Sequence, residues 1–207
     1  MRATDGAAGE WIELPGARLY YEPDFVSAGS GDSRALYETL VTTASWRQDE
    51  IQLFGKRQRI PRLSAWYGDT DAIYSYSGLR LEPMPWLAPL AWLRERLNRH
   101  LGMSFNSVLL NYYRDGADSM GAHSDDEPEL GPSPRIAMVS LGAERRFVLT
   151  PRLKGAAQRW QRELADGSLL LMAGDCQRHW RHELPKTRRP VAGRISLTYR
   201  QIWGRIK

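Results

Sequence analysis

Two histidines and one aspartate in this 207-residue chain have the types and spacing of a metal-ligand set. His123 and Asp125 form a His-x-Asp pair, and His182 follows later in the chain. Two imidazoles and one carboxylate can hold Fe(II) on one face and leave the other positions open for a cosubstrate and O₂. A surface histidine near a turn produces the same His-x-Asp pattern, so the pair alone does not decide the matter.

The segments that flank these residues are expected to be strands. The apolar run 105–113 predicts a strand before the pair, and 136–141 predicts another strand after it. Residues i and i+2 of an extended segment project to the same side, so His123 and Asp125 can bind one metal ion.

Two arginines near the C-terminal end, Arg194 and Arg200, alternate with apolar residues. In a strand they share one face with Ser196 and Thr198, and their Cα atoms are roughly 20 Å apart. Two guanidinium groups that fold toward each other can hold both carboxylates of a diacid such as 2-oxoglutarate. The alternative is a polar strand edge that faces solvent.

The composition favours one basic domain. A chain of 207 residues suits a single well-filled domain, and its net charge of +5 favours nucleic acid as a partner. The basic residues are concentrated in 176–207, whereas 115–129 is acidic and surrounds the expected metal. A merely soluble basic surface is the alternative.

The cellular compartment is suggested by three absences. Cys176 is the only cysteine, so an intrachain disulfide is not possible. The residues 1–9 lack the apolar core of a leader, and the chain has no apolar run of membrane-spanning length. We therefore expect a cytoplasmic protein that has no membrane partner.

Two helices are expected in the first half of the chain. Asp32 is a suitable N-cap for a helix over 33–44. A second helix is expected from Pro85 or Trp86 to Leu101, where Gly102 ends it.

Strands dominate after residue 104. Asp166-Gly167 lies between two strand-like segments, 158–165 and 168–172, and predicts a hairpin. Short strands after two helices indicate a β-sandwich covered by helices, which is a mainly β fold with flanking helices (α+β).

Four motifs occur in order along the chain. They are Asn111–Gly116, His123–Glu127, His179–Pro185 and Arg194–Arg200. Together they resemble the AlkB family of Fe(II)/2-oxoglutarate dioxygenases, over roughly residues 51–202. The pieces 53–56, 60–62, 67–69 and 74–79 are most similar to the duplex-DNA repair type of this family.

The resemblance implies a fold and a set of cofactors. The fold is a double-stranded β-helix, a jelly-roll variant, and the cofactors are Fe(II), 2-oxoglutarate and O₂. Residues 1–10 are expected to be a loose tail and 11–207 a single dioxygenase domain. Within it, 11–104 is an extension with helices and a nucleotide-recognition lid, and 105–203 is the core.

The resemblance also assigns the cofactor residues. The metal and catalytic residues are His123, Asp125 and His182. The 2-oxoglutarate residues are Asn111, Tyr113, Arg194, Thr198 and Arg200. Arg200 is expected at the C1 end near the iron and Arg194 at the distal carboxylate. His179 is a rival ligand by position, but the family pattern favours His182.

Base recognition is implied by the same resemblance. An enzyme that acts on a base in a duplex extrudes it into a pocket, stacks on it and reads its edge. Tyr74 and Tyr76 are expected to stack on the base, and Asp126 and Glu127 to bind it. Asp126 would accept from the exocyclic amine of a cationic N-methylated adenine or cytosine. Ordinary strand residues are the alternative for the tyrosines.

A DNA contact is expected from residues 54–62. Phe54 matches a wedge that fills the gap left by the extruded base, and a core phenylalanine is the alternative. The neighbouring residues expected to contact DNA are Gly55, Lys56, Arg57 and Arg62.

The implied function is DNA repair. The chain is expected to demethylate 1-methyladenine and 3-methylcytosine in double-stranded DNA as a monomer, releasing formaldehyde, succinate and CO₂. A related dioxygenase that acts on RNA or single strands is one alternative. A non-catalytic nucleic-acid-binding jelly roll is the other.

Overall fold

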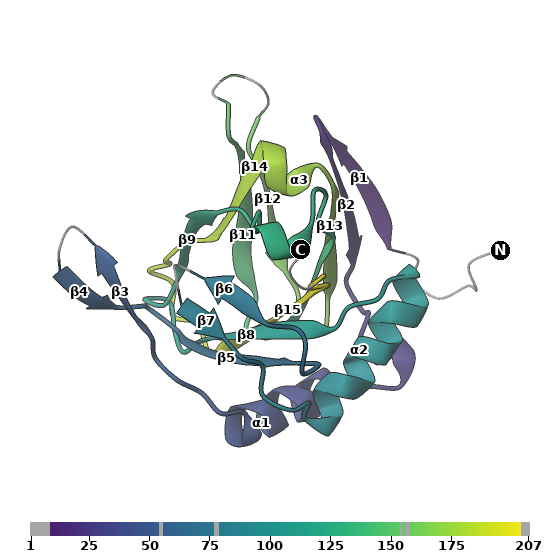
Figure 1. Ribbon diagram of the computed structural model, residues 1–207, viewed down its shortest axis with the longest axis vertical. Coiled ribbons are helices and arrows are strands. Elements are labelled where there is room, and N and C mark those ends of the chain that lie inside the picture. The colour runs from purple at the N-terminus through teal and green to yellow at the C-terminus, as the bar shows by residue number, and fades with distance from the viewer. Residues whose placement is uncertain (1–8, 54–55, 77–78, 154, 156–157, 204–207) are drawn as a thin grey trace.

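A computed structural model describes residues 9–53, 56–76, 79–153, 155 and 158–203. Two antiparallel sheets form the body of the protein (Figure 1). Within the described residues, the large sheet has the strand order β1-β2-β13-β10-β15-β8-β5, and the small sheet has the order β12-β11-β14-β9.

The strands of the large sheet are β1 (Glu10–Leu14), β2 (Ala17–Glu22), β5 (Leu63–Gly68), β8 (Ser107–Tyr113), β10 (Ile136–Gly142), β13 (Leu169–Gly174) and β15 (Arg194–Arg200). Those of the small sheet are β9 (Met120–His123), β11 (Arg145–Pro151), β12 (Trp160–Leu164) and β14 (Trp180–Leu184). β1 begins at Glu10, the last residue of the segment expected to be a loose tail.

Strands β8 to β15 pass back and forth between the two sheets. β8, β10, β13 and β15 belong to the large sheet, and β9, β11, β12 and β14 to the small one. This alternation is that of the expected double-stranded β-helix. The inner faces of both sheets supply one apolar cluster, which includes Met138, Phe147, Leu149, Leu170 and Met172.

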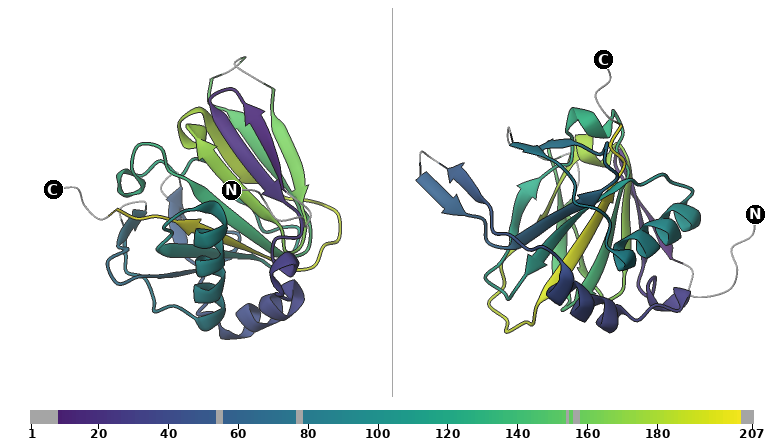
Figure 2. Two further views of the ribbon diagram at one scale, coloured as in Figure 1. Left: turned by 90° about the vertical axis from the view of Figure 1, so that its right-hand side faces the viewer. Right: turned by 60° about the horizontal axis from the view of Figure 1, so that its bottom comes forward.

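Helices cover the outer face of the large sheet (Figure 2). The covering helices are α1 (Ser33–Thr43) and α2 (Ala88–Leu101). The short helix α3 (Cys176–His179) directly precedes β14, and the 3₁₀ turns are η1 (Ser27–Gly29) and η2 (Pro128–Leu130). α1 and α2 pack Leu40, Leu93 and Leu97 against Leu197 and Tyr199 of β15 in a second apolar cluster. The large sheet is therefore buried on both faces, which explains why all seven residues of β15 are buried.

The helix ends follow the expected capping chemistry. The Asp32 carboxylate accepts from the Ala35 amide at 3.0 Å at the start of α1. Gly102 ends α2 with φ of 64°, the left-handed conformation that glycine adopts without strain. α2 begins at Ala88, later than predicted. Trp86 precedes the helix, and its indole donates to Asp69 at 2.7 Å.

The predicted hairpin at Asp166-Gly167 is wrong. β12 pairs with β11 in the small sheet, whereas β13 pairs with β10 and β2 in the large sheet. Gly167 has the positive φ of a tight turn, but the turn carries the chain from one sheet to the other. The Asp166 carboxylate fixes this corner by accepting from the Gly142 amide and the Ser33 hydroxyl.

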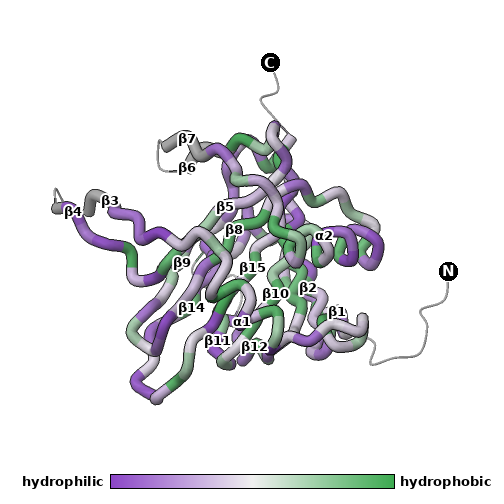
Figure 3. The backbone as a smooth tube through the Cα atoms, turned by 90° about the horizontal axis from the view of Figure 1, so that it is seen from below, coloured by the Kyte–Doolittle hydropathy of each residue, from purple (hydrophilic) through white to green (hydrophobic). Residues whose placement is uncertain are grey.

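Two short hairpins extend the body. They are β3 (Glu50–Leu53) with β4 (Lys56–Arg59), and β6 (Tyr74–Tyr76) with β7 (Leu79–Leu81). The first projects away from the two sheets, and its hydrophilic strand β4 is purple in Figure 3. Across the described ranges, no helix has the length and apolarity needed to span a membrane.

Candidate active site

The three candidate metal ligands lie together on the small sheet. His123 ends β9 and pairs with His182 of β14 in the antiparallel register, with their ring centroids 4.2 Å apart. Asp125 lies two residues beyond β9, and one ligand atom from each residue lies within 4.8 Å of the others. The structure therefore brings together the three residues that the sequence predicted.

Each histidine presents a ring nitrogen suited to a metal ion. His123 Nδ1 donates to the Gly121 carbonyl at 2.9 Å, which leaves Nε2, the nitrogen nearer Asp125, as the ligand atom. Burial, followed by the nearby His123, lowers the pKa of His182 to about 3 against the opposing effect of Asp125. His182 is therefore neutral near pH 7, as a metal ligand must be.

Asp125 supplies a buried negative charge. Burial raises the pKa of its carboxyl group, but Arg200 and the two histidines outweigh this effect and lower it to about 2. Arg200 donates to Oδ2 through Nη2 at 2.8 Å and through Nε at 3.2 Å. The other oxygen, Oδ1, lies 3.7 Å from His123 Nε2 and so points toward the position of a shared metal ion.

A pocket between the two sheets adjoins the two histidines, which are among its lining residues. Among its lining residues are four of the five predicted 2-oxoglutarate residues, Asn111, Tyr113, Thr198 and Arg200. They come from β8 and β15, which are adjacent strands, so a single register places all four side chains in the pocket.

The fifth residue, Arg194, is completely buried. It lies opposite Tyr113 in the register, and it donates to Ser140 Oγ at 2.8 Å and to the Leu164 carbonyl at 3.3 Å. Burial lowers the pKa of Arg194 to about 10. Its Nε has no hydrogen-bond partner in the described part of the chain.

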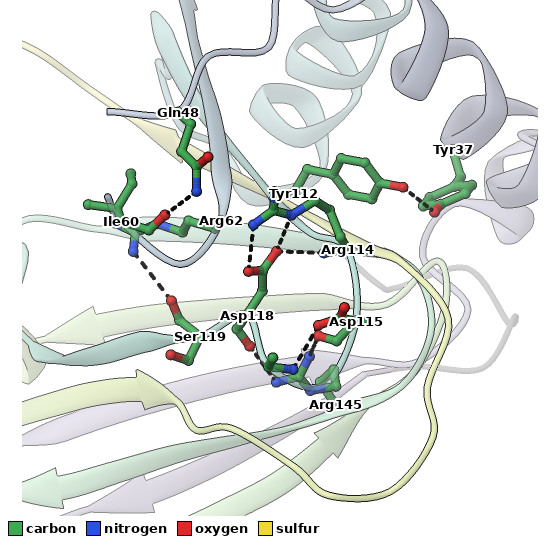
Figure 4. A network of polar contacts seen from close by, with 11 residues as sticks. Tyr37, Gln48, Ile60, Arg62, Tyr112, Arg114, Asp115, Asp118, Ser119 and Arg145 are labelled. Carbon is green, nitrogen blue, oxygen red and sulfur yellow. Dashed lines mark hydrogen bonds and ion pairs between the residues drawn. The ribbon is translucent and has the colours of Figure 1, made fainter. Parts of the chain in front are cut away.

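Several buried arginines lie near Tyr113, which lines this pocket. The positive charges of Arg62, Arg145 and Arg194 oppose the rise that burial causes in the pKa of the Tyr113 hydroxyl. Among the described residues, the hydrogen bonds of these arginines go to neutral oxygens. The nearby Asp118 carboxylate is held by Arg114 at 2.7 Å, as Figure 4 shows. Buried charges are normally paired, so the pocket is suited to a ligand with two negative charges.

Comparison with known proteins gives the family. The 2OG-Fe(II) oxygenase superfamily matches residues 18–200. The chain belongs to that superfamily. Among similar proteins, DNA oxidative demethylase ALKBH2 of Homo sapiens is 43% identical over 73% of this chain and 60% of its own length. The Mus musculus protein of the same name is 42% identical over 74% of this chain and 66% of its own length.

A second group of relatives confirms that the chain is an AlkB-type member. Alpha-ketoglutarate-dependent dioxygenase alkB homolog 3 of Homo sapiens is 37% identical over 90% of this chain and 67% of its own length. The solved structure of OsALKBH1 aligns with 92% of this chain and all of that chain, with a TM-score of 0.59 at 15% identity. This last likeness supports the jelly-roll fold alone. The chain spans 57 to 66% of the length of the ALKBH2 relatives from mouse, cow and human.

The residues present fit Fe(II) and 2-oxoglutarate. Two imidazoles and a carboxylate are the ligand set expected for Fe(II) in oxygenases. The buried arginines near Tyr113 and the Arg194 Nε, which has no hydrogen-bond partner among the described residues, fit a dicarboxylate in the adjoining pocket. His179, the rival ligand, is exposed and lies outside the triad.

The prediction that Arg62 contacts DNA is wrong. Only 7% of Arg62 is exposed, so its guanidinium is not available to a phosphate. Its Nε donates to Asn111 Oδ1 at 2.8 Å, and its Nη1 donates to the Ser119 carbonyl at 3.3 Å. Arg62 therefore fixes the Asn111 side chain at the cosubstrate pocket (Figure 4 shows its position beside Ser119).

The two acids expected to bind the base follow directly after the metal ligand Asp125. Asp126 is exposed, and its Oδ2 accepts from Arg152 Nη1 at 2.7 Å. Glu127 is half-buried and precedes η2. Both residues are thus close in the chain to the metal site, and the Asp126 carboxylate has a cationic partner.

The remaining predicted substrate residues are only partly described. Phe54 and Gly55 lie outside the described residues, and for Tyr74, Tyr76 and Lys56 only the backbone is described, in β6 and β4. Arg57 is exposed on β4, as a phosphate contact requires. The wedge and stacking roles remain predictions.

Sequence reasoning missed several residues that hold the ligands. Ser124 Oγ donates to the Trp180 carbonyl at 2.8 Å, and the Asp125 amide donates to Gln177 Oε1 at 3.0 Å. Arg145 donates to the carbonyls of Asp115 and Asp118. A lone serine, glutamine or arginine has no sequence pattern that signals such a contact.

Proposed function

We propose that the protein is an Fe(II)/2-oxoglutarate-dependent dioxygenase that oxidatively demethylates N-alkylated bases in DNA. The bases are of the 1-methyladenine and 3-methylcytosine type, and the products are the repaired base, formaldehyde, succinate and CO₂. The single observation that carries the proposal is the His-Asp-His triad beside a pocket that four of the five predicted 2-oxoglutarate residues line. Relatives named DNA oxidative demethylase supply the substrate class.

The protein's part in the reaction is to hold and orient the reactants. His123, Asp125 and His182 hold the metal, and Arg200 keeps the carboxylate ionised and fixed. Bound Fe(II), with 2-oxoglutarate and O₂, supplies the oxidising chemistry that removes the methyl group. The pocket between the sheets is lined by Met138, Phe147 and other apolar side chains, which limits the access of water.

The 2-oxoglutarate ligand would bind along β8 and β15. Asn111, Tyr113 and Thr198 line the pocket and would offer hydrogen bonds, and Arg194, which lies opposite Tyr113 in the register, would offer charge to the distal carboxylate. Arg200 would meet the C1 end because it lies beside the metal ligand Asp125. The fixed positions of these groups in a buried sheet favour a preorganised site.

The carboxylates after the triad would recognise the alkylated base. A cationic base complements Asp126 and Glu127, whereas a neutral base gains less from them. Tyr74 and Tyr76 of β6 would stack on the extruded base, and Phe54 would occupy the gap it leaves. Lys56 and Arg57, on a hairpin that projects from the body, would follow the phosphates.

The proposal also covers the polymer, the oligomeric state and the compartment. The preferred polymer is double-stranded DNA, and the protein acts on it as a monomer in the cytoplasmic compartment. The domain division at 104/105 is part of the same proposal, with the nucleotide-recognition lid in 11–104 and the catalytic core in 105–203.

The test is mass spectrometry of oligonucleotides that contain 1-methyladenine or 3-methylcytosine. Duplex and single-stranded forms are incubated with the protein, Fe(II), 2-oxoglutarate and air, and reactions that lack 2-oxoglutarate are the control. We expect loss of one methyl group, fastest in the duplex. A preference for RNA or for single strands would replace the proposed substrate, and binding without turnover would leave a non-catalytic nucleic-acid-binding protein.

A further inference from the structure

Gln177 is a buried polar residue to which the proposed reaction gives no role. It lies in α3, five residues before His182, and only 1% of it is exposed. Its Oε1 accepts from the Asp125 amide at 3.0 Å, and its Nε2 donates to Met172 Sδ at 3.7 Å. The two contacts use both ends of the amide, so the side chain has one defined orientation.

The Asp125 amide needs this partner for a physical reason. β9 ends at His123, so the strand ladder does not reach Asp125. A buried amide without an acceptor destabilises the folded state. The acceptor is a side chain rather than a neighbouring strand, and it belongs to the same segment as His182.

The contact is one of a continuous series between the two ligand segments. His123 pairs with His182, Ser124 Oγ donates to the Trp180 carbonyl at 2.8 Å, and Asp125 donates to Gln177. The next residue, Asp126, accepts from Arg152, whose Nη1 also lies 3.3 Å from the Gln177 carbonyl. Each residue from 123 to 126 therefore contacts the segment 177–182, either directly or through Arg152.

We infer that Gln177 is a positioning residue that sets the separation between the carboxylate ligand and His182 before the metal binds. Arg200 fixes the Asp125 side chain, and Gln177 fixes the backbone that carries it. α3 continues directly into β14, so Gln177 and His182 lie in one continuous short segment. The inference rests on the metal site of the proposed function and does not depend on its nucleic-acid substrate.

The consequence is measurable as metal affinity. Partners that orient metal ligands typically change affinity by about 10- to 100-fold when they are removed. Gln177→Leu removes the acceptor while keeping a similar volume, so it should weaken Co²⁺ binding to the metal-free protein within that range. A residue that merely filled space would leave the affinity unchanged.

The matched control is Asn98→Leu. Asn98 Oδ1 accepts from the Phe105 amide at 2.8 Å, and its Nδ2 donates to the Phe105 carbonyl at 3.2 Å, in α2 on the other side of the large sheet. It therefore loses a comparable side-chain-to-backbone contact away from the metal. Thermal unfolding of both metal-free variants measures the cost to the fold.

The experiment is a Co²⁺ titration followed by visible absorption, with the full chain. We expect a 10- to 100-fold rise in Kd for Gln177→Leu and a wild-type Kd for Asn98→Leu. A wild-type Kd for a folded Gln177→Leu protein, or an equal loss in both variants, would overturn the inference. Should Gln177→Leu fail to fold, Gln177→Asn, which is one methylene shorter, must show the same rise. Absence of Co²⁺ binding by the wild type would instead overturn the proposed metal site itself.

Discussion

At the scale of residues, charge and hydrogen bonding decide what each side chain does. The triad was predictable because His123 and Asp125 are two residues apart next to a predicted strand and His182 lies in a recognisable motif. Arg62 was not, because sequence alone does not distinguish an exposed arginine from a buried one. It lies among basic residues in the sequence but donates to Asn111 in the structure. No sequence pattern indicated a role for Gln177.

Asp125→Ala should abolish turnover and metal binding. The change removes the anionic ligand, and it also leaves the buried Arg200 guanidinium without its carboxylate. Breaking a buried ion pair typically costs about 3–5 kcal/mol, so the metal-free variant should unfold at lower denaturant concentration. Demethylation by this variant at ordinary Fe(II) concentration would show that Asp125 does not bind the metal.

Arg194→Ala should raise the 2-oxoglutarate requirement steeply. Loss of a charge-assisted contact removes on the order of 2–3 kcal/mol, or about 30- to 150-fold in affinity. The measurement is the KM for 2-oxoglutarate, with methylated-DNA affinity as the control that should change little. An unaltered KM would mean that Arg194 only donates hydrogen bonds to Ser140 and Leu164 and does not bind 2-oxoglutarate.

Arg62 and Arg57 should behave differently despite their proximity in the sequence. Arg62→Ala should raise the KM for 2-oxoglutarate, because Asn111 loses the group that orients it, and should leave the salt dependence of DNA binding unchanged. Arg57→Ala, at an exposed position, should reduce the slope of log affinity against log salt by about 0.9. A reduced slope for Arg62→Ala would contradict its burial.

At the scale of elements, the sequence predicted where helices and strands lie better than which strands pair with each other. The caps Asp32 and Gly102 gave the helix ends, and alternation gave β15. The turn at Asp166-Gly167 was recognised, but its two strands belong to different sheets. Turn chemistry reports the local backbone only, whereas the choice between sheets depends on packing between distant segments, such as β13 against β2.

The prediction for duplex DNA concerns Phe54, which follows β3 in the sequence. Phe54→Ala should impair repair of a duplex far more than repair of a single strand. Flipping a base from a duplex costs a few kcal/mol of unstacking, which an inserted ring offsets in part. The measurement is the ratio of kcat/KM on the two substrates at one fixed salt concentration. Equal losses on both would return Phe54 to a structural role.

At the scale of the whole molecule, two sheets and two helices produce one buried site. The large sheet is covered by α1 and α2 on one side and faces the small sheet on the other, so polar residues on its inner face are removed from water. This burial turns Arg194 and Arg200 from surface charges into groups that require an anion. The family motifs predicted that these two arginines bind a diacid, but their burial is visible only in the folded chain.

The measurement that tests the central claim most directly follows formaldehyde and succinate in one reaction with a duplex that contains 1-methyladenine. Fe(II) and 2-oxoglutarate are present, and the same duplex without the methyl group is the control. We predict equal amounts of formaldehyde, succinate and repaired base, with much less succinate from the control duplex. Succinate formed at the same rate on both duplexes, without formaldehyde, would show an oxygenase whose substrate is something other than alkylated DNA.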